Sequence, residues 1–596
     1  MLDDKLLRHY SHLVELGVQQ DIVISLKDIS EKLFTSLRHA RTLLKSMQEL
    51  EWLAWTPKVG RNQRSLLRLH YDLKQLKADI AASFIALGKY EKALMIVDGD
   101  HSVFGHLLQK TSGAMRREGQ LHIQLTYHRL FSSLLPHKPQ RSGERFFIRQ
   151  IYCCLVRCDK SGTLTPELAH HWKHNEERTR WKFYLRPQLF FHNEREINAD
   201  EVVKLFKQLK ALPEYEKELN HLQHISVIHP LCLEFHLTQA DYGFAGLLAD
   251  LRYSIQPSEQ VTHPLSAIIG SGAFQLQEHS KERIQLQAFD KFYACRALTD
   301  TVTIWQLPQK MSNSFANTLL NSNSFANTLL KIGVIEQSQA SRTHSLQLNE
   351  TPNTASKEQE YTRIEDGYLL LLFNQKSSET ELSAMQRRYL GNLLTANRLL
   401  NQLEKDEKQF GASIAHHLLP RWHKVYKQDV EKQRLPESLN IAVFDHLALL
   451  DCANAISAVL EQIGIHCQIN VYSYAELQHK ALNKQLNETL ILTSFNLDDN
   501  RPTSIFRWLL SDPVLHQALS GEGSDWLVQA LTNIRASQPL SAYFSELESI
   551  VTSMLYANWL SPLFHHRQTL KFEGILKGVS ITDWGWPAIK DVWSED

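Results

Sequence analysis

The chain has 596 residues, of which 43% are hydrophobic and 22% charged, and its 65 Lys and Arg balance its 65 Asp and Glu. This length exceeds what one hydrophobic core organises, so we expect two to four domains in a protein of ordinary soluble composition. A net charge of zero argues against a surface that binds polyanions over the whole molecule, although it leaves local basic patches open.

The sequence gives no sign of export or of membrane insertion. Residues 1–10 (MLDDKLLRHY) lack the charged and then apolar stretches of a signal peptide. No run of about 18 apolar residues is present, so no transmembrane helix is expected. The seven cysteines form no CxxC pair, which argues against a disulfide framework and fits a reducing compartment. We therefore expect a cytoplasmic protein.

The first elements along the chain predict a winged helix. Residues 6–16 place apolar side chains at helical spacing, and a second helix begins at Ser25, with Asp28 three positions later as in a capping box. Ser36 can cap a third helix. Residues 52–71 follow as two short apolar runs around a turn. Helix, turn, helix and hairpin is the order of a winged helix DNA-binding domain.

The third helix has one basic face and one apolar face. At 100° per residue, Arg38, Arg41, Thr42 and Lys45 fall within an arc of about 100°. The other side, which would pack on the first two helices, consists of Leu37, Ala40, Leu43, Leu44 and Met47. The basic face is either the solvated side of a surface helix or the side that reads DNA, and the helix alone does not separate these two interpretations.

The hairpin favours the second interpretation. Its tip carries Lys58, Arg61 and Arg64, and Gly60 permits a turn with positive φ. Residues 36–71 hold seven Lys and Arg against two Glu, a net charge of +5 on a chain that is otherwise negative. DNA binding by arginine in such a wing is favoured by counterion release and by the negative potential of a narrow minor groove. The candidate DNA-binding residues are Ser36, Arg38, His39, Arg41, Thr42, Lys45, Lys58, Arg61, Asn62 and Arg64.

A helical connector is expected over residues 72–116. It has one apolar stripe, formed by Leu73, Leu76, Ile80, Phe84 and Leu87. The stripe either docks on the rest of the chain or forms a dimer seam. Packing within the chain is favoured, because the stripe is shorter than three heptads.

The remainder of the chain, from about residue 119, mixes strand and helix patterns. One segment has a helix capped at Asn198, and residues 439–474 read as a βαβ unit with two nearly continuous apolar strands. The fold class is therefore α/β. No H-E-x-x-H, GxSxG, Walker A or GxGxxG motif occurs, and we expect neither enzymatic activity with catalytic residues, nor a metal site, nor a cofactor.

Three stretches of this remainder carry a family resemblance. They read RQIYCCLVRCDKSGTLTPELAHHW, WKFYLRPQLFFHNEREINADEVV and IGSGAFQLQ followed by AFDKFYACRALTDTVTIWQL. In this order they resemble the motifs of family 5 bacterial solute-binding proteins, the peptide-binding relatives of ABC importers. Together with RHARTLLKSMQELEWLAWTPKVGRNQRS near the start and SITDWGWPAIKDVW near the end, the chain resembles the SgrR family of cytosolic bacterial regulators.

This resemblance implies a domain plan and a function. It implies a winged helix DNA-binding domain at 1–71, the connector, and a two-lobed, periplasmic-binding-protein-like domain (type II) at 117–596. We expect lobe I over about 117–273 and 543–596, and lobe II over about 274–542. The implied protein is a transcriptional regulator, an activator in sugar-phosphate stress, with a ligand sensor in the cleft between the lobes. The implied partners are double-stranded promoter DNA, a sugar phosphate or peptide-like effector, and RNA polymerase.

The resemblance also suggests ligand-binding candidates. Exported relatives often have a Trp-x-x-Asp-Tyr-x-x-Pro stretch whose aspartate binds a peptide's ammonium group. FNLDDNRP (495–502) occupies the corresponding place. Either Asp498 or Asp499 points into the cleft, or both belong to a solvated turn. We favour the solvated turn. Tyr152, Phe274 and Asn374 lie in motifs near the lobe junction, where packing and hinge roles are favoured over ligand contact.

Two further readings remain. MSNSFANTLL (311–320) is followed by the near copy NSNSFANTLL (321–330), which we interpret as an insertion in a loop, since repeat architectures need three or more units. The alternative function is a cytosolic solute- or peptide-binding protein whose winged helix mediates protein contacts. Steep salt dependence and strong preference for a promoter would favour the regulator.

Overall fold

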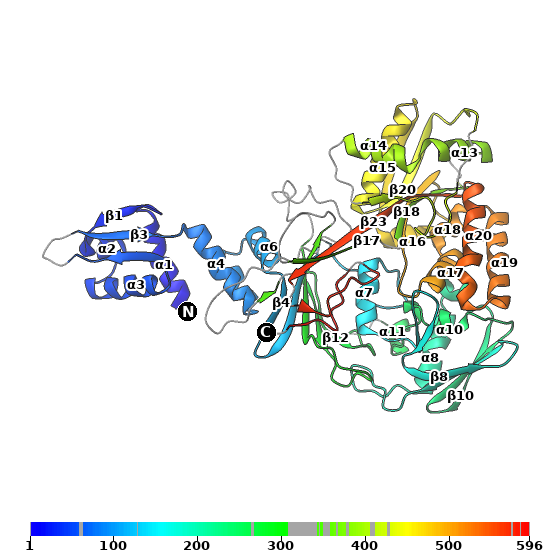
Figure 1. Cartoon of the computed structure of the whole chain (residues 1–596), viewed down its shortest axis with the longest axis horizontal. Coiled ribbons are helices and arrows are strands. Elements are labelled where there is room, and N and C mark those ends of the chain that lie inside the picture. The colour runs from blue at the N-terminus through cyan, green and yellow to red at the C-terminus, as the bar shows by residue number, and fades with distance from the viewer. Residues whose placement is uncertain are drawn as a thin grey trace.

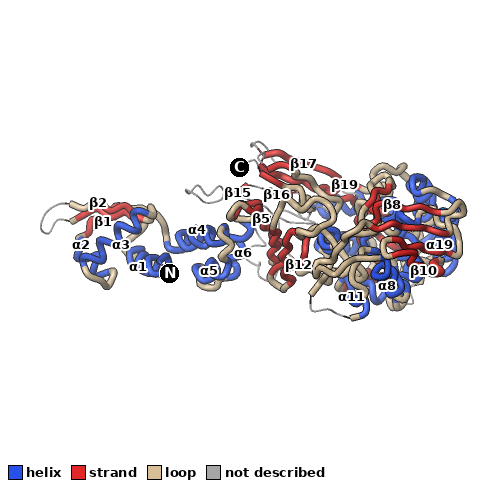
Figure 2. The backbone as a smooth tube through the Cα atoms, turned by 90° about the horizontal axis from the view of Figure 1, so that it is seen from below, coloured by secondary structure: helices blue, strands red, loops and turns tan. Residues whose placement is uncertain are grey.

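The computed structural model describes residues 2–58, 64–127, 129–263, 267–307, 343–344, 346–349, 358–364, 367–376, 381–405, 412–425, 430–573, 576–584 and 586–594. A small N-terminal domain stands at one end of the molecule and joins a larger body, built on three sheets, through helix α4 (Leu73–Ala86) (Figure 1). A perpendicular view shows the same separation (Figure 2). The tandem copy at 311–330 and wing residues 59–63 lie outside the described residues.

The N-terminal domain is a winged helix, and its elements follow the predicted order. They are α1 (Leu2–Val14), β1 (Asp21–Ile24), α2 (Leu26–Lys32), α3 (Leu37–Glu49), β2 (Leu53–Thr56) and β3 (Ser65–Leu69). The capping box at Ser25 and Asp28 is present, and the Ser36 hydroxyl accepts the His39 N–H at the start of α3. Strand β1 was not predicted. It completes a sheet of order β1-β3-β2.

The connector folds as three helices that pack within the chain. They are α4 (Leu73–Ala86), α5 (Tyr90–Ile96) and α6 (His101–Lys110). Leu76 is buried, and Leu73, Ile80 and Phe84 pack against the same hydrophobic core, which runs from the winged helix to Trp305 of the large body. Leu87, the last residue of the predicted stripe, is exposed.

The first part of the large body is a six-stranded sheet of order β12-β13-β14-β5-β4-β15. Its strands are β4 (Gly113–Arg117), β5 (Gln120–Tyr127), β12 (Phe274–His279), β13 (Arg283–Ala288), β14 (Thr301–Gln306) and β15 (Thr343–His344). Helix α7 (Ser142–Ile151) packs on it. Gly272 of the IGSGAF motif lets α7 pack this closely, because any larger residue would place its Cβ only 2.5 Å from the Gln150 carbonyl oxygen. Since β14 pairs in parallel with β5, the sheet does not follow the predicted lobe division at residue 273.

The second part is a four-stranded antiparallel sheet of order β10-β11-β9-β8. Its strands are β8 (Ala169–His174), β9 (Arg180–Leu185), β10 (Leu222–His229) and β11 (Cys232–Leu237), and β6 (Val156–Cys158) and β7 (Leu164–Pro166) form a separate hairpin. Its helices are α8 (Ala199–Lys210), η1 (Pro213–Tyr215), α9 (Glu216–Leu219), α10 (Phe244–Leu247), η2 (Leu251–Tyr253) and α11 (Glu259–Thr262). Asn198 caps α8 as predicted.

The third part is a sheet whose main path is β16-β23-β18-β22-β20-β21. Its strands are β16 (Leu346–Asn349), β17 (Glu358–Ile364), β18 (Gly367–Phe373), β19 (Ala412–Ile414), β20 (Ser438–Phe444), β21 (His466–Tyr472), β22 (Leu490–Asn496) and β23 (Leu560–Glu573). The predicted βαβ unit is β20, α15 (Leu447–Glu461) and β21, with the two strands parallel.

Helices cover this third sheet, and two short strands lie near the C-terminus. The helices are α13 (Ala384–Leu393), α14 (Ala396–Lys405), α16 (Tyr474–Leu482), α17 (Arg501–Ser511), α18 (Pro513–Ala518), α19 (Gly521–Ser537), η4 (Leu540–Ala542) and α20 (Tyr543–Tyr556). The strands are β24 (Leu576–Lys577) and β25 (Trp593–Ser594).

The hydrophobic cores group the three parts unequally. One continuous core runs through the four-stranded part and the third sheet, while the six-stranded part has its own core, to which α7 and residues 579–592 contribute. Of the helices that the structure describes, none is long and apolar enough to cross a membrane.

Candidate functional site

The outer face of α3 is basic and exposed. Ser36, Arg38, His39, Arg41, Thr42 and Lys45 all lie on the surface of the domain. Ala40, Leu43, Leu44 and Met47 are buried, which confirms the predicted division of the helix. Leu37, predicted on the apolar face, is half exposed, because it occupies the first helical position beyond the core contacts.

The charges on this face are largely free to meet a ligand. Lys45 makes an exposed pair with Glu49 at 3.7 Å, a contact of little energetic weight. Within the described residues, no carboxylate lies within 4.0 Å of Arg38 or Arg41. The Thr42 hydroxyl donates to the Arg38 carbonyl at 3.3 Å, on the helix itself. Two guanidinium groups therefore project from the helix without an internal partner.

The hairpin places further cations beside α3. The Lys58 N–H donates to the Ser65 hydroxyl at 3.2 Å, so the two arms are joined where the described part of the wing ends. Lys58 and Arg64 are exposed. Arg61 and Asn62, the remaining wing candidates, lie outside the described residues.

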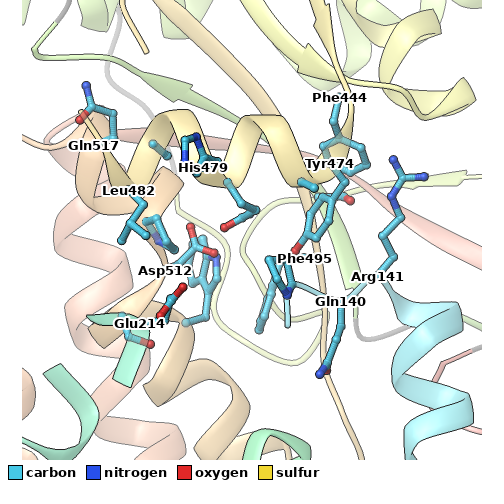
Figure 3. A pocket seen from close by; sticks show the side chains of 18 of the residues that line it. Gln140, Arg141, Glu214, Phe444, Tyr474, His479, Leu482, Phe495, Asp512 and Gln517 are labelled. Carbon is cyan, nitrogen blue, oxygen red and sulfur yellow. The ribbon is translucent and has the colours of Figure 1, made fainter. Parts of the chain in front are cut away.

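A second candidate site is a cavity of about 1500 Å³ in the large body. All three parts line it: residues 127–145 next to the six-stranded sheet, residues 213–217 and 252 of the four-stranded part, and residues 376 and 444–525 of the third. One wall is aromatic, with Phe444, Tyr474 and Phe495 (Figure 3). Trp508 also lines the cavity. Phe495 stacks on Trp508 with ring centroids 5.1 Å apart.

Most arginines of the cavity wall are neutralised from behind. Arg129, Arg145, Arg252 and Arg507 each pair with a carboxylate that does not itself line the cavity. The lysines differ. Burial lowers the pKa of Lys217 to about 8, with the neighbouring Lys376 adding to the effect. Burial, and then Lys484, also lowers the pKa of Lys376.

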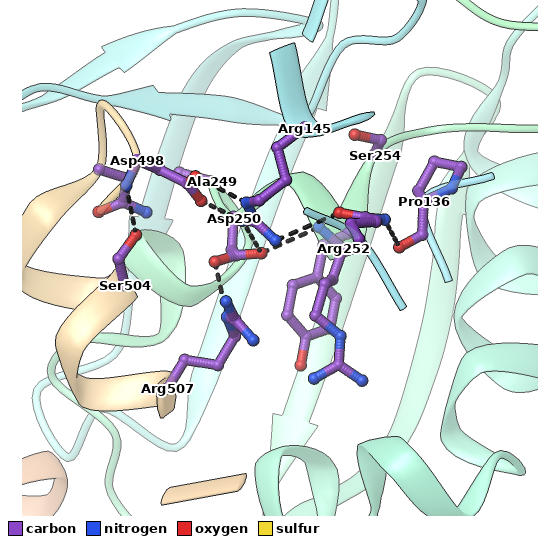
Figure 4. Close-up of polar contacts among 12 residues, drawn as sticks. Pro136, Arg145, Ala249, Asp250, Arg252, Ser254, Asp498, Ser504 and Arg507 are labelled. Atoms are coloured by element: carbon purple, nitrogen blue, oxygen red, sulfur yellow. Dashed lines mark hydrogen bonds and ion pairs between the residues drawn. The ribbon is translucent and has the colours of Figure 1, made fainter. Parts of the chain in front are cut away.

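Behind the cavity lies a network of buried charges (Figure 4). Asp250, with no exposed surface, accepts from Arg507 at 2.8 Å and lies 3.5 Å from Arg145. Arg145 also donates from Nε to Asp498 at 2.7 Å and through a second contact from Nη2. The Trp584 indole N–H donates to the same carboxylate at 2.8 Å. The network joins α7, the end of the four-stranded part and the loop after β22.

None of the five predicted ligand-binding residues lines the cavity. Tyr152 and Phe274 are fully buried in the core of the six-stranded part. The Asn374 amide donates to the carbonyls of Leu486 and Glu488, at 3.1 and 2.8 Å, and thereby ties two loops together.

The two aspartates have structural partners. Asp498 is 1% exposed, so it does not belong to a solvated turn, and its carboxylate is taken up by Arg145 and Trp584. Asp499 pairs with Arg149 at 2.9 Å. The arginine partners of Asp498 and Asp499 lie about 350 residues away along the chain, so the local sequence pattern did not reveal them.

The residues that do line the cavity were missed for the same reason. Arg141 and Asp445 lie 304 positions apart, yet the structure brings them into contact. One signal was available. Phe495 occupies the aromatic position of the motif that was matched to the binding stretch of exported relatives, and it is this residue that reaches the cavity. Among the described residues, no group of three His, Cys, Asp or Glu is arranged to hold a metal ion.

Two family models match the chain in succession. Residues 5–119 match the N-terminal domain of sugar transport-related sRNA regulators. Residues 163–376 match the middle region of bacterial extracellular solute-binding proteins of family 5.

Solved structures of solute-binding proteins share the fold of the large body. A dipeptide-binding protein from Pseudoalteromonas, in complex with Met-Leu, superposes with a TM-score of 0.60 at 12% identity, over 79% of this chain and all of the other. NikA from Brucella suis, in complex with Fe(III)-EDTA, gives 0.59 at 13% identity, over 79% and 99%. These likenesses confirm the predicted fold and say nothing of the ligand.

Full-length relatives extend over both domains. An HTH-type transcriptional regulator SgrR from Photorhabdus laumondii is 27% identical over 96% of this chain and 95% of its own length. Its namesake from Escherichia coli O157:H7 is 28% identical over 97% and 96%. Both relatives are named as transcriptional regulators and not as enzymes. With the two domain models in the same order along one chain, this protein is similar to the SgrR regulators over nearly its whole length.

Proposed function

We propose that this protein is a cytosolic, DNA-binding transcriptional regulator that senses a small molecule in the cavity of its solute-binding domain. The observation that carries the proposal is the exposed basic face of α3. Arg38 and Arg41 have no carboxylate partner among the described residues, and Lys58 and Arg64 stand on the adjoining hairpin. Such a surface fits a phosphate backbone and the edges of bases in the major groove.

The connector supports communication between the two sites. Trp305 of β14 packs edge-on against Tyr90 and Phe104, with ring centroids 4.8 and 5.8 Å apart. The Tyr90 hydroxyl donates to the Gln124 side chain at 2.9 Å. The Arg117 guanidinium donates to two carbonyls at the end of α4, at 2.9 and 3.1 Å. The winged helix is therefore attached through packed contacts rather than through a free linker.

The cavity supports the sensing role, because three parts of the body enclose it. A ligand that contacts all three stabilises one arrangement of them, and it shifts the equilibrium only by its difference in affinity for the two arrangements. A ten- to hundred-fold change in DNA affinity requires about 1.4–2.8 kcal/mol of coupling.

The sheet pairing suggests a revised division of the lobes. We assign residues 113–127 and 274–306 to one lobe, because their strands pair directly. Helices α17, α19 and α20 pack together beside the third sheet and belong to the other lobe. A sugar phosphate or a peptide-like compound remains the proposed effector, and recruitment of RNA polymerase the proposed mode of activation.

The proposal is tested by DNA binding of the full-length chain. A double variant, Arg38→Ala with Arg41→Ala, is expected to lose most of its preference for promoter DNA over DNA of random sequence, since each base-contacting arginine contributes about 1–3 kcal/mol. The readout is fluorescence anisotropy at several salt concentrations.

A matched control removes the same charge elsewhere. Lys89→Ala with Lys92→Ala neutralises two exposed cations of the connector and is expected to leave promoter affinity within about two-fold. If the α3 double variant bound the promoter as the unmodified protein does, α3 would not be the recognition helix. If the unmodified protein showed no sequence preference, the winged helix would fit a protein-contact role instead.

A further inference from the structure

Three arginines follow one another at intervals of four residues, Arg141 at the N-cap of α7 and Arg145 and Arg149 within the helix, so their guanidinium groups project from one face. Each pairs with an aspartate that follows a strand of the third sheet: Arg141 with Asp445, Arg145 with Asp498 and Arg149 with Asp499. The row therefore bridges the six-stranded part and the third part of the body.

The three pairs differ in their access to the cavity. The Arg145 and Asp498 side chains are only 10% and 2% exposed, and the Arg149 side chain is 3% exposed. The Asp445 side chain, in contrast, is 58% exposed, and both Asp445 and Arg141 line the cavity. A ligand can thus compete for the outermost arginine without opening the buried network.

Arg141 is fixed by contacts that do not involve Asp445. Its guanidinium lies over the ring of Phe444 at 5.0 Å and over that of Tyr474 at 5.6 Å. Figure 3 shows it rising from α7 towards these two rings. Both of its hydrogen bonds to Asp445 use Nη2. Among the described residues, its Nε and Nη1 groups have no hydrogen-bond partner, and they leave a donor edge for a planar or tetrahedral anion.

The surrounding charge favours an anion at this place. Residues 127–145 contribute four cations to the cavity wall and no carboxylate. Arg129 and Arg145 are paired with buried carboxylates behind the wall, and Lys138 lies in the same segment as Arg141. Asp445 is the one acidic group of the wall that touches Arg141. The other acidic groups lie on the four-stranded part and on residues 512–525. They are Glu214, Glu216, Asp512 and Asp525.

We infer that Arg141 is the anion-binding residue of the cavity, and that the phosphate or carboxylate group of a ligand takes the place of Asp445 at its guanidinium. The inference rests on the proposed function, in which the cavity binds the effector. The Arg141 side chain is already only 14% exposed and is held by the two rings, so exchange of one carboxylate for another anion needs little new desolvation or ordering of Arg141. It would also release Asp445, and so loosen one of the three bridges between α7 and the third part.

The test uses the full-length chain and inorganic phosphate as the probe. The melting temperature is measured in increasing sodium phosphate against sodium chloride at equal ionic strength, and the apparent Kd follows from the shift. Arg141→Gln is expected to abolish the phosphate-specific shift. Arg141→Lys, which keeps the charge but not the fork, is expected to weaken it. Asp445→Asn is expected to tighten phosphate binding about two- to five-fold, because it removes a partly exposed competing ion pair.

Arg296→Gln serves as the control, because Arg296 pairs with Asp290 on the surface of the six-stranded part. It is expected to bind phosphate as the unmodified protein does. Equal phosphate binding by Arg141→Gln, or no phosphate-specific shift in the unmodified protein, would overturn the inference. Neither result would touch the proposed function, which is tested separately by sequence-specific DNA binding and by the effect of a cavity ligand on DNA affinity.

Discussion

The pKa of Glu144, a residue of α7, depends strongly on its hydrogen-bond and ion-pair partners. Its carboxylate has no exposed surface and accepts from both Arg129 Nη groups at 2.7 Å and from the Ser132 N–H and hydroxyl at 3.0 Å. Burial by itself would raise its pKa, but the attraction of Arg129 and these hydrogen bonds outweigh burial and lower the pKa to about 2. The carboxylate therefore stays ionised in the folded protein at every pH above about 2.

This shift predicts a pH dependence of stability. A carboxyl whose pKa falls on folding stabilises the protein above its unfolded pKa, near 4.5, and this contribution disappears as the pH falls towards 2. The full contribution is roughly 3 kcal/mol. Glu144→Gln is expected to melt well below the unmodified protein at pH 7, with the difference shrinking between pH 4.5 and 2.5 in calorimetry. A difference that stays constant over this range would contradict the assignment, and Glu278→Gln, at a more exposed Arg pair, is the control.

The helix and the wing are expected to divide the work of DNA recognition. Arg41→Ala, on the exposed face of α3, should relax sequence preference by about 1–3 kcal/mol. Arg64→Ala, on the wing, should weaken binding to specific and random DNA alike and lower the salt slope by about one. Competition anisotropy against random DNA measures both quantities. An equal loss of preference in the two variants would remove the division.

At the scale of elements, the connector depends on one aromatic contact. Trp305 is 8% exposed and inserts between α5 and α6, with the Arg283 guanidinium 5.4 Å from its ring. Trp305→Ala is expected to destabilise this junction by about 3–5 kcal/mol. Amide hydrogen exchange should accelerate in α5 and α6 and remain unchanged in α3.

Trp526→Ala is the matched control, because Trp526 of α19 is 41% exposed and distant from the connector in the sequence. Unchanged exchange in α5 and α6 of Trp305→Ala would show that the connector is held by other contacts. The proposed route between the two sites would then have to run elsewhere.

The sequence predicted elements where the signal was local. The caps at Ser25, Ser36 and Asn198 marked helix starts that the structure confirms, because capping depends on residues three positions apart. Strand β1 was missed, since its four residues alternate between exposed and half-buried positions and lie in an apparent break. Its identity depends on pairing with β3, some 44 residues later.

At the scale of the whole molecule, the fold class and the order of domains were predictable, and the ligand site was not. The family motifs covered both domains, and the fold comparisons agree with them. The cavity, however, is built from contacts such as Arg141 with Asp445 and Arg145 with Asp498, which join segments more than 300 residues apart. Asp498 illustrates what the sequence motif could not predict. The motif placed it in a binding stretch, and the structure pairs it with an arginine of α7.

The measurement that tests the central claim most directly is the affinity of the full-length chain for DNA from upstream of its own coding sequence, with and without a cavity ligand. Sugar phosphates and short peptides are first screened for a concentration-dependent rise in melting temperature. We predict at least about a thousand-fold preference over random DNA, and a ten- to hundred-fold change in promoter affinity when a stabilising compound is added. A promoter affinity that no stabilising compound changes would contradict the account.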